Sequence, residues 1–124
     1  MPKTALILFA HGARDPEWAA PLKHVASIMR EHAPALRVEL AFFEFMQPRL
    51  QASVETLLPE GFQRILILPM FIARGGHLQR DVPLLVEELR ARHPRIDFQL
   101  AAAVGEAEAV MQAMAAHALR LAGV

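Results

Sequence analysis

The sequence predicts an α/β fold: a four-stranded parallel sheet in the strand order 2-1-3-4, with helices on both faces. Four short apolar segments alternate with four segments of helical pattern along the 124 residues. Strands that alternate with helices of about 10–15 residues are typical of βαβ units. Right-handed crossovers then place helices on both sides of the sheet. We expect one domain over residues 1–124, because a chain of this length forms one core.

The first half of this pattern begins with residues 4–10, which are apolar throughout, as in a strand covered on both faces. A helix is expected from Pro16 to about His32, because Pro34 then stops it. Residues 36–42 carry charged residues between apolar ones, which predicts a strand at the edge of the sheet.

The next helix follows Pro48, which suits the first turn of a helix, and ends at Gly61 as a left-handed cap. Residues 64–69 are the most strand-like of all and predict a central strand. We expect residues 70–77 to be a loop, because two glycines disfavour a helix there.

The last part of the chain predicts a helix over residues 78–92, in which Pro83 is tolerated only within the first two turns. Residues 96–102 form the fourth predicted strand. An Ala-rich helix then runs from residue 105 or 106 to about Leu121.

Composition excludes several classes of function. The chain has 13 basic and 13 acidic residues and no long run of like charge, so we expect no nucleic-acid or anionic-membrane partner. It has no cysteine, which excludes disulfides, thiolate metal sites and iron–sulfur clusters and fits a cytoplasmic location. The first residues do not form a signal peptide, and no apolar run reaches transmembrane length.

Two histidines follow the two central strands of the predicted sheet. His11 comes directly after the strand 4–10, and His77 lies in the loop after the strand 64–69. Ligands bind at the carboxyl ends of parallel strands, where successive connections diverge, so both histidines are expected at one rim. A neutral imidazole binds divalent metals and can also accept a proton. A core or capping role for His11 stays open. The remaining histidines are expected on the surface: His24, His32, His93 and His117.

A carboxylate and several aromatic rings follow the second predicted strand. Glu44 lies between Phe43 and Phe45 and is expected in the same rim, where it would bind metal and carry protons. An exposed loop glutamate is the alternative. Phe42, Phe43, Phe45 and Phe71 could offer flat apolar walls to a ligand, although we expect at least two of them to be core residues.

The same loops contain candidates for binding an acidic ligand. Gly75 and Gly76 allow close approach of the backbone, and the helix start after them favours anions. Arg14, Arg74 and Arg80 could each bind a carboxylate, or could simply be solvated.

Three segments carry a family resemblance. The stretches AHGARDP (10–16), FFEFMQPRL (42–50) and LPMFIARGGHLQRDVP (68–83) resemble the small sirohydrochlorin chelatases of the cobalamin and sirohaem pathways. The resemblance implies a single-lobe, three-layer chelatase-like sandwich. It also implies ATP-independent insertion of Co²⁺, Fe²⁺ or Ni²⁺ into sirohydrochlorin, with the metal as substrate and no organic cofactor.

The resemblance also assigns roles to residues. The two catalytic histidines of the family match His11 and His77, and its rim glutamate matches Glu44. Larger relatives carry two lobes in one chain, so the single lobe here implies a homodimer with facing lobes. The ligand of the family is rich in carboxylates, which is consistent with a rim that contains arginines.

Two other functions remain open at this point. A carrier of metal or tetrapyrrole would need the same side chains but would not accelerate insertion. A phosphoryl-transfer enzyme of the histidine phosphatase type also has a His-Gly after its first strand, but the arginine that precedes its histidine is replaced here by Ala10.

Overall fold

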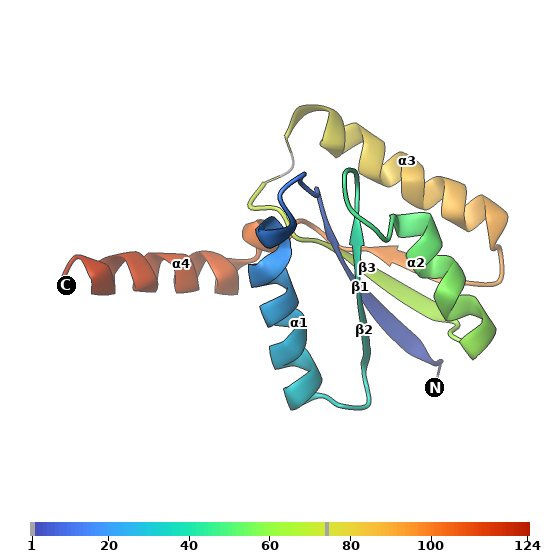
Figure 1. The fold of residues 1–124 in the computed structure, drawn as a ribbon, viewed down its shortest axis with the longest axis horizontal. Helices are drawn as coiled ribbons and strands as arrows, with labels where there is room; N and C mark the ends of the chain where they lie inside the picture. The colour runs from blue at the N-terminus through green and yellow to red at the C-terminus, as the bar shows by residue number, and fades with distance from the viewer. Residues whose placement is uncertain (1, 74) are drawn as a thin grey trace.

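The sheet consists of four parallel strands in the order β2-β1-β3-β4, as predicted (Figure 1). The computed structural model describes residues 2–73 and 75–124, and only the backbone of His77. The strands are β1 (Thr4–Ala10), β2 (Arg37–Phe42), β3 (Arg64–Pro69) and β4 (Asp97–Leu100). β1 and β3 are the central strands, and β1 pairs with β2 and β3 along its whole length.

Helices lie on both faces of this sheet (Figure 1). α1 covers one face, α2 and α3 cover the other, and α4 extends away from the body of the fold. Their bounds are α1 (Ala20–His32), α2 (Leu50–Leu57), α3 (Gly76–Arg92) and α4 (Glu108–Leu121), with short 3-10 helices η1 (Pro16–Ala19), η2 (Leu58–Glu60) and η3 (Val104–Glu106). Among the described residues, no helix has the length and apolar character that crossing a bilayer requires.

The alternation of side chains along β1 divides the core into two layers. Ala5, Ile7 and Phe9 point to the face that α2 and α3 cover, whereas Leu8 and Ala10 point to the face that α1 covers. Burial on both faces explains why β1 is apolar throughout. It also fixes the register of the sheet, because a slip by one residue would exchange the two layers.

The glycine-rich segment before α3 differs from the prediction. α3 begins at Gly76 rather than at residue 78, so residues 76 and 77 are helical, and Gly75 is the N-cap. The amides of Leu78 and Gln79 donate to the carbonyl of Gly75. Glycine is among the residues favoured at an N-cap, so Gly75 is compatible with a helix that begins at Gly76. Pro83 lies in the third turn, deeper than expected.

The last strand and helix also differ from expectation. β4 is shorter than predicted, ending at Leu100, and α4 starts only after η3. α4 contains no buried residue. It is held at its base by η3, where the amide of Gly105 donates to the carbonyl of Phe71 over 2.9 Å.

We predict that Ile67→Ala destabilises the protein, because Ile67 is fully buried in β3 between α2 and α3. Urea unfolding should show a loss of about 2–5 kcal/mol, the usual cost of a cavity of this kind. Ile72→Ala is the matched control, since Ile72 is 74% exposed and its truncation should cost less than about 0.5 kcal/mol. Equal losses would contradict the assignment of Ile67 to the core.

Candidate functional site

His11 and Glu44 form a pair at the carboxyl edge of the sheet. The Nε2 atom of His11 lies 2.7 Å from Oε1 of Glu44, and the two side chains are 39% and 38% exposed. The ring of Phe43 stands edge-on to the imidazole, with 6.0 Å between the ring centroids. The site is therefore partly shielded by an aromatic ring but open to solvent and to a ligand.

The β1–β2 ladder continues beyond the strands and brings this pair together. The amide of Phe43 donates to the carbonyl of Ala10 over 2.8 Å, and the amide of Glu44 donates to the carbonyl of His11 over 2.9 Å. Gly12 makes the close approach possible. Its φ is +97°, and a Cβ placed there would lie 1.9 Å from the carbonyl oxygen of Glu44. Only glycine fits this position without displacing the loop.

The loop then turns sharply at Phe45. This residue has a φ of +70°, which is rare for a residue that carries a side chain and costs roughly 1–2 kcal/mol. Its ring is 52% exposed, and the guanidinium of Arg14 lies 5.1 Å from the ring centroid. Strained backbone of this kind is often found at functional sites. The turn presents an aromatic ring and a cation at the rim.

A hollow of about 460 Å³ opens beside Glu44. Arg49 lines this hollow, and its Nη1 donates to the carbonyl of Phe43 over 3.2 Å. Sequence reasoning did not select Arg49 or Gly12. The folding of the loop back onto β2, where the amide of Phe42 donates to the carbonyl of Pro48, brings Arg49 to the site. In the sequence, the only indication of a role for Arg49 was that it lies in the segment 42–50, which carries the family resemblance. The hollow is lined by Phe9, Phe42, Phe43, Glu44, Arg49, Leu50, Gln51 and Leu85.

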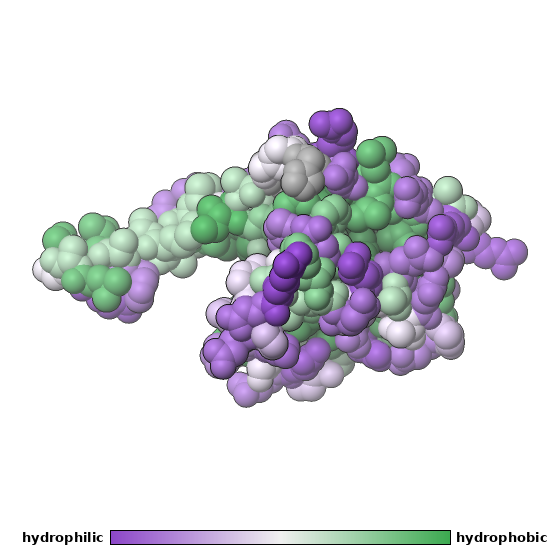
Figure 2. Space-filling view, turned by 45° about the horizontal axis from the view of Figure 1, so that its top comes forward, coloured by the Kyte–Doolittle hydropathy of each residue, from purple (hydrophilic) through white to green (hydrophobic). Residues whose placement is uncertain are grey.

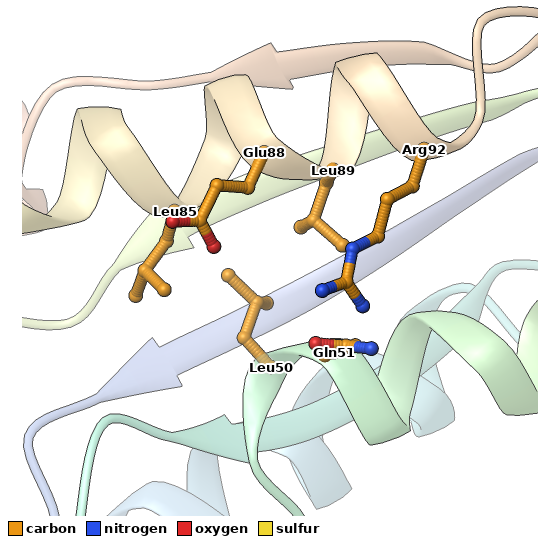
Figure 3. Close-up of a pocket in the computed structure, with 6 residues that line it drawn as sticks. All are labelled: Leu50, Gln51, Leu85, Glu88, Leu89 and Arg92. Carbon is orange, nitrogen blue, oxygen red and sulfur yellow. The ribbon is translucent and has the colours of Figure 1, made fainter.

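A second, much smaller cavity lies between α2 and α3 (Figure 3). Three leucine side chains converge on it, and the guanidinium of Arg92 extends toward Gln51. Its volume is about 20 Å³, which suffices for a water molecule but not for a larger ligand. It shares Leu50 and Leu85 with the hollow at Glu44, which is the larger of the two.

The predicted aromatic walls divide into rim and core residues. Phe42 is buried beneath α1, and Phe71 packs against the core on the opposite face. Phe43 is half-buried between His11 and Phe9, whose ring centroid lies 6.4 Å away. Phe45 is the most exposed of the four. A ligand-binding role for Phe71 stays a prediction.

His77 is brought to the same edge as His11 by its backbone. β3 ends beside β1, where the amide of Met70 donates to the carbonyl of Phe9, and His77 follows as the second residue of α3. The side chain of His77 and the whole of Arg74 lie outside the described residues. Among the described side chains, no group of three or more histidines and carboxylates is placed to hold a metal. The predicted ligand set thus has two described members.

The other candidates lie around this rim. Gly75 and Gly76 are exposed at the start of α3, where the amides of the first turn favour an anion. Arg80 is exposed in α3. Of the histidines expected on the surface, His93 differs. Its Nε2 is buried without a hydrogen-bond partner, and its ring lies 6.4 Å from that of Phe98.

A charge network lies at the opposite edge of the sheet, at the start of β2. Arg37 binds Glu60 over 2.7 Å and Glu39 over 2.6 Å. The hydrogen bond to Glu60 contributes most to raising the pKa of Arg37, and the bond to Glu39 adds to it. The bond between Arg37 and Glu60 also lowers the pKa of Glu60. Because Arg37 begins β2 and Glu44 follows its end, this network is separate from the His11–Glu44 pair.

We predict that Gly12→Ala destabilises the protein by roughly 3 kcal/mol, because the new Cβ meets the carbonyl of Glu44 and the backbone φ disfavours it. Urea unfolding measures the loss. Gly75→Ala is the control, since its Cβ would meet no atom within 4 Å, and it should cost less than about 1 kcal/mol. A Gly12→Ala variant with the same free energy of unfolding as the parent would show that the two loops are not in contact.

Comparison with known proteins gives consistent matches. The family model described as CbiX matches residues 5–121. Sirohydrochlorin cobaltochelatase from Methanocaldococcus jannaschii is 33% identical over 89 residues, which are 72% of this chain and 62% of that protein. The matched region spans less than two thirds of each of three curated relatives, namely 35%, 57% and 62% of their lengths.

Solved structures share the fold. A CbiX protein from Marinobacter aquaeolei VT8 has a TM-score of 0.86 and 27% identity, and the match covers 97% of this chain and 98% of that one. The sirohydrochlorin chelatase SirB from Bacillus subtilis subspecies spizizenii, solved in complex with cobalt, has a TM-score of 0.78. It is 22% identical, and the match covers 92% of this chain but 49% of SirB, so it shows the fold alone.

Proposed function

Because the chain belongs to the CbiX family, we propose that it is a sirohydrochlorin chelatase, which inserts Co²⁺, Fe²⁺ or Ni²⁺ into sirohydrochlorin without ATP. The observation that carries the proposal is the His11–Glu44 pair at the open edge of the sheet. Relatives named sirohydrochlorin cobaltochelatase support the substrate. The metal is a substrate in this proposal, and the ligand types do not select among the three ions.

The pair supplies a proton acceptor. Two pyrrole N–H protons must leave the macrocycle as the metal enters, and a positioned base accelerates such a transfer. An ionised carboxylate accepts hydrogen bonds only, so Glu44 fixes the neutral His11 with its proton on Nε2. The lone pair then lies on Nδ1. Glu44 acts both by orienting the ring and by stabilising the imidazolium that forms.

The same two side chains can bind the incoming metal. Nε2 of His11 and Oε1 of Glu44 are 2.7 Å apart, close to the roughly 3 Å that separates neighbouring ligand atoms of an octahedral ion. If the ring proton moves from Nε2 to Nδ1, the lone pair of Nε2 is free, and Nε2 and Oε1 could then bind one divalent ion together. We assign His77 as a further metal ligand and acid–base residue, because its backbone lies at the same edge. An incomplete protein shell leaves positions for the ring nitrogens.

The surrounding rim fits a flat, acidic macrocycle. Phe43 and Phe45 offer apolar ring faces, and Arg14 and Arg49 lie beside them. Guanidinium groups bind carboxylates through paired hydrogen bonds. We propose that these arginines, with Arg74 and the amides at Gly75 and Gly76, bind the peripheral carboxylates of the substrate.

We also propose that the chain acts as a homodimer in the cytoplasm. The Marinobacter protein has nearly the same length as this chain, whereas the match spans only about half of SirB. Two copies with facing rims would enclose the macrocycle from both sides, which one open edge cannot do.

Catalysis can be distinguished from mere binding by one assay. The protein is incubated anaerobically with sirohydrochlorin and Co²⁺ or Fe²⁺, and metal insertion is followed by the absorbance of the macrocycle. We expect insertion well above the spontaneous rate, with turnover of more than one macrocycle per chain. An unchanged rate accompanied by tight binding would identify a carrier and overturn the proposal.

We predict that His11→Ala lowers the insertion rate at least about 100-fold, the usual contribution of a positioned acid–base group. Glu44→Gln should lower it less, because the amide still contacts the ring but cannot stabilise its positive charge. His24→Ala is the control and should keep full activity, since His24 is exposed on α1. A large loss of activity in His24→Ala would show that the site does not lie at the His11–Glu44 edge.

His77→Ala should also reduce insertion by orders of magnitude while leaving urea stability within about 1 kcal/mol of the parent. The reason is the predicted loss of a metal ligand at the start of α3. His32→Ala serves as the matched control, since His32 is exposed at the end of α1. Full activity of His77→Ala would assign that residue a structural role and leave His11 and Glu44 as the working pair.

A further inference from the structure

α4 is an apolar helix that touches almost nothing in its own chain. It extends away from the sheet and the other helices in Figure 1 and contains no buried residue. In Figure 2 the extended arm is mostly green, the colour of hydrophobic residues. Apart from His117, residues 109–119 include no acidic or basic side chain. An apolar helix of this kind is stable in water only when a partner covers it.

Four residues of α4 form a continuous apolar stripe, whereas Leu119, which is 52% exposed, lies on the side of Gln112. Met111, Met114, Ala118 and Leu121 follow each other at intervals of three, four and three residues. This spacing places them on one face of a helix, as in helices that pack against another element. Ala116 and Gln112 lie on the opposite face. Met111, Met114 and Leu121 are among the exposed large hydrophobic residues.

The total surface of the chain indicates how much is left uncovered. A compact monomer of 13.8 kDa exposes roughly 6,600 Å². This chain exposes 7881 Å², or about 1,300 Å² more than that. A stable protein–protein interface covers about 800 Å² on each partner. The excess is therefore large enough for a stable dimer.

The chain also presents an apolar hollow that its own α4 does not occupy. The hollow, of about 310 Å³, lies at the start of α1 beside the end of β3. On this face of the sheet, Leu66 and Leu68 of β3 are only partly buried. Trp18 and Val25 border the hollow and are exposed. It is lined by Ala10, Trp18, Pro21, Leu22, Val25 and Met70, all of them apolar.

The base of α4 is packed tightly against the body of the fold, from which α4 extends. A Cβ at Gly105 would lie 2.1 Å from the carbonyl oxygen of Ile72, so η3 is packed tightly against the segment after β3. Ala107 is extended and starts α4 directly after η3. With its base held in this way, α4 leaves the fold and leaves its stripe unpaired.

We propose that the occupant of the hollow is the α4 stripe of a second copy of this chain, exchanged reciprocally between two copies. Reciprocal exchange gives a closed two-fold dimer and covers both apolar surfaces at once. Because Ala10 lines the hollow and directly precedes His11, the exchanged helix would lie behind the loop that holds His11. The inference deepens the proposed homodimer by naming the surfaces that form it.

The test begins with the mass of the protein in solution, measured by sedimentation equilibrium at micromolar concentrations. We expect twice the chain mass for the parent. Ala118→Arg should raise the dimer dissociation constant roughly 100-fold or more, because a guanidinium would be buried in an apolar contact. Ala116→Arg, the same change on the opposite face of α4, should leave the dimer intact. Val25→Glu should dissociate it, and Ser27→Glu, on the exposed side of α1, should not.

Mixing two variants tests the exchange itself. Ala118→Arg and Val25→Glu are each expected to be monomeric, but together they retain one unaltered helix–hollow contact and place an arginine opposite a glutamate in the other. We therefore expect the mixture to form dimers. Circular dichroism checks that each variant is folded.

Three results would overturn the inference: a monomeric parent, equal effects of Ala118→Arg and Ala116→Arg, or a mixture that stays monomeric. A dimer that survives Ala118→Arg would overturn the exchange while leaving the homodimer proposal in place. Insertion activity is measured separately, so its absence would count against the chelatase proposal alone.

Discussion

The β1–β2 ladder is the constraint on which the site depends. Two hydrogen bonds beyond the strand ends, from Phe43 to Ala10 and from Glu44 to His11, place a carboxylate beside an imidazole. Their register follows from the burial of β1 on both faces, because a shift by one residue would turn its core side chains over. The same packing that stabilises the fold thus sets the 2.7 Å contact at its edge.

The site carries local features that packing alone would not favour. Phe45 has a positive φ and a large exposed ring. Gly12 allows two loops to approach so closely that a side chain at this position would overlap the carbonyl of Glu44. Both lie within a few residues of the His11–Glu44 pair. Strain and close approach are thus concentrated at the open edge that carries the candidate site.

The apolar surface of α4 has a different physical origin. Three helices cover the sheet, but the face of β3 beside α1 stays partly open. Meanwhile α4 extends outward from a base fixed by Gly105. An isolated chain would leave both surfaces in water, at a cost proportional to their apolar area. The composition of α4 is thus consistent with the exchanged dimer that we propose.

The sequence by itself determined the sheet, its strand order and the edge at which the candidate site lies. Apolar runs and helical spacing report burial directly, so β1 and β3 were predicted with their observed bounds, and His11 and Glu44 were placed at one rim. Only the tertiary structure decided which side chains meet. The pairing of His11 with Glu44, the return of Arg49 to the hollow and the outward course of α4 depend on loop conformations that no periodic pattern records. Loops carry no repeating burial signal, because their backbone is fixed by contacts between segments far apart in the chain.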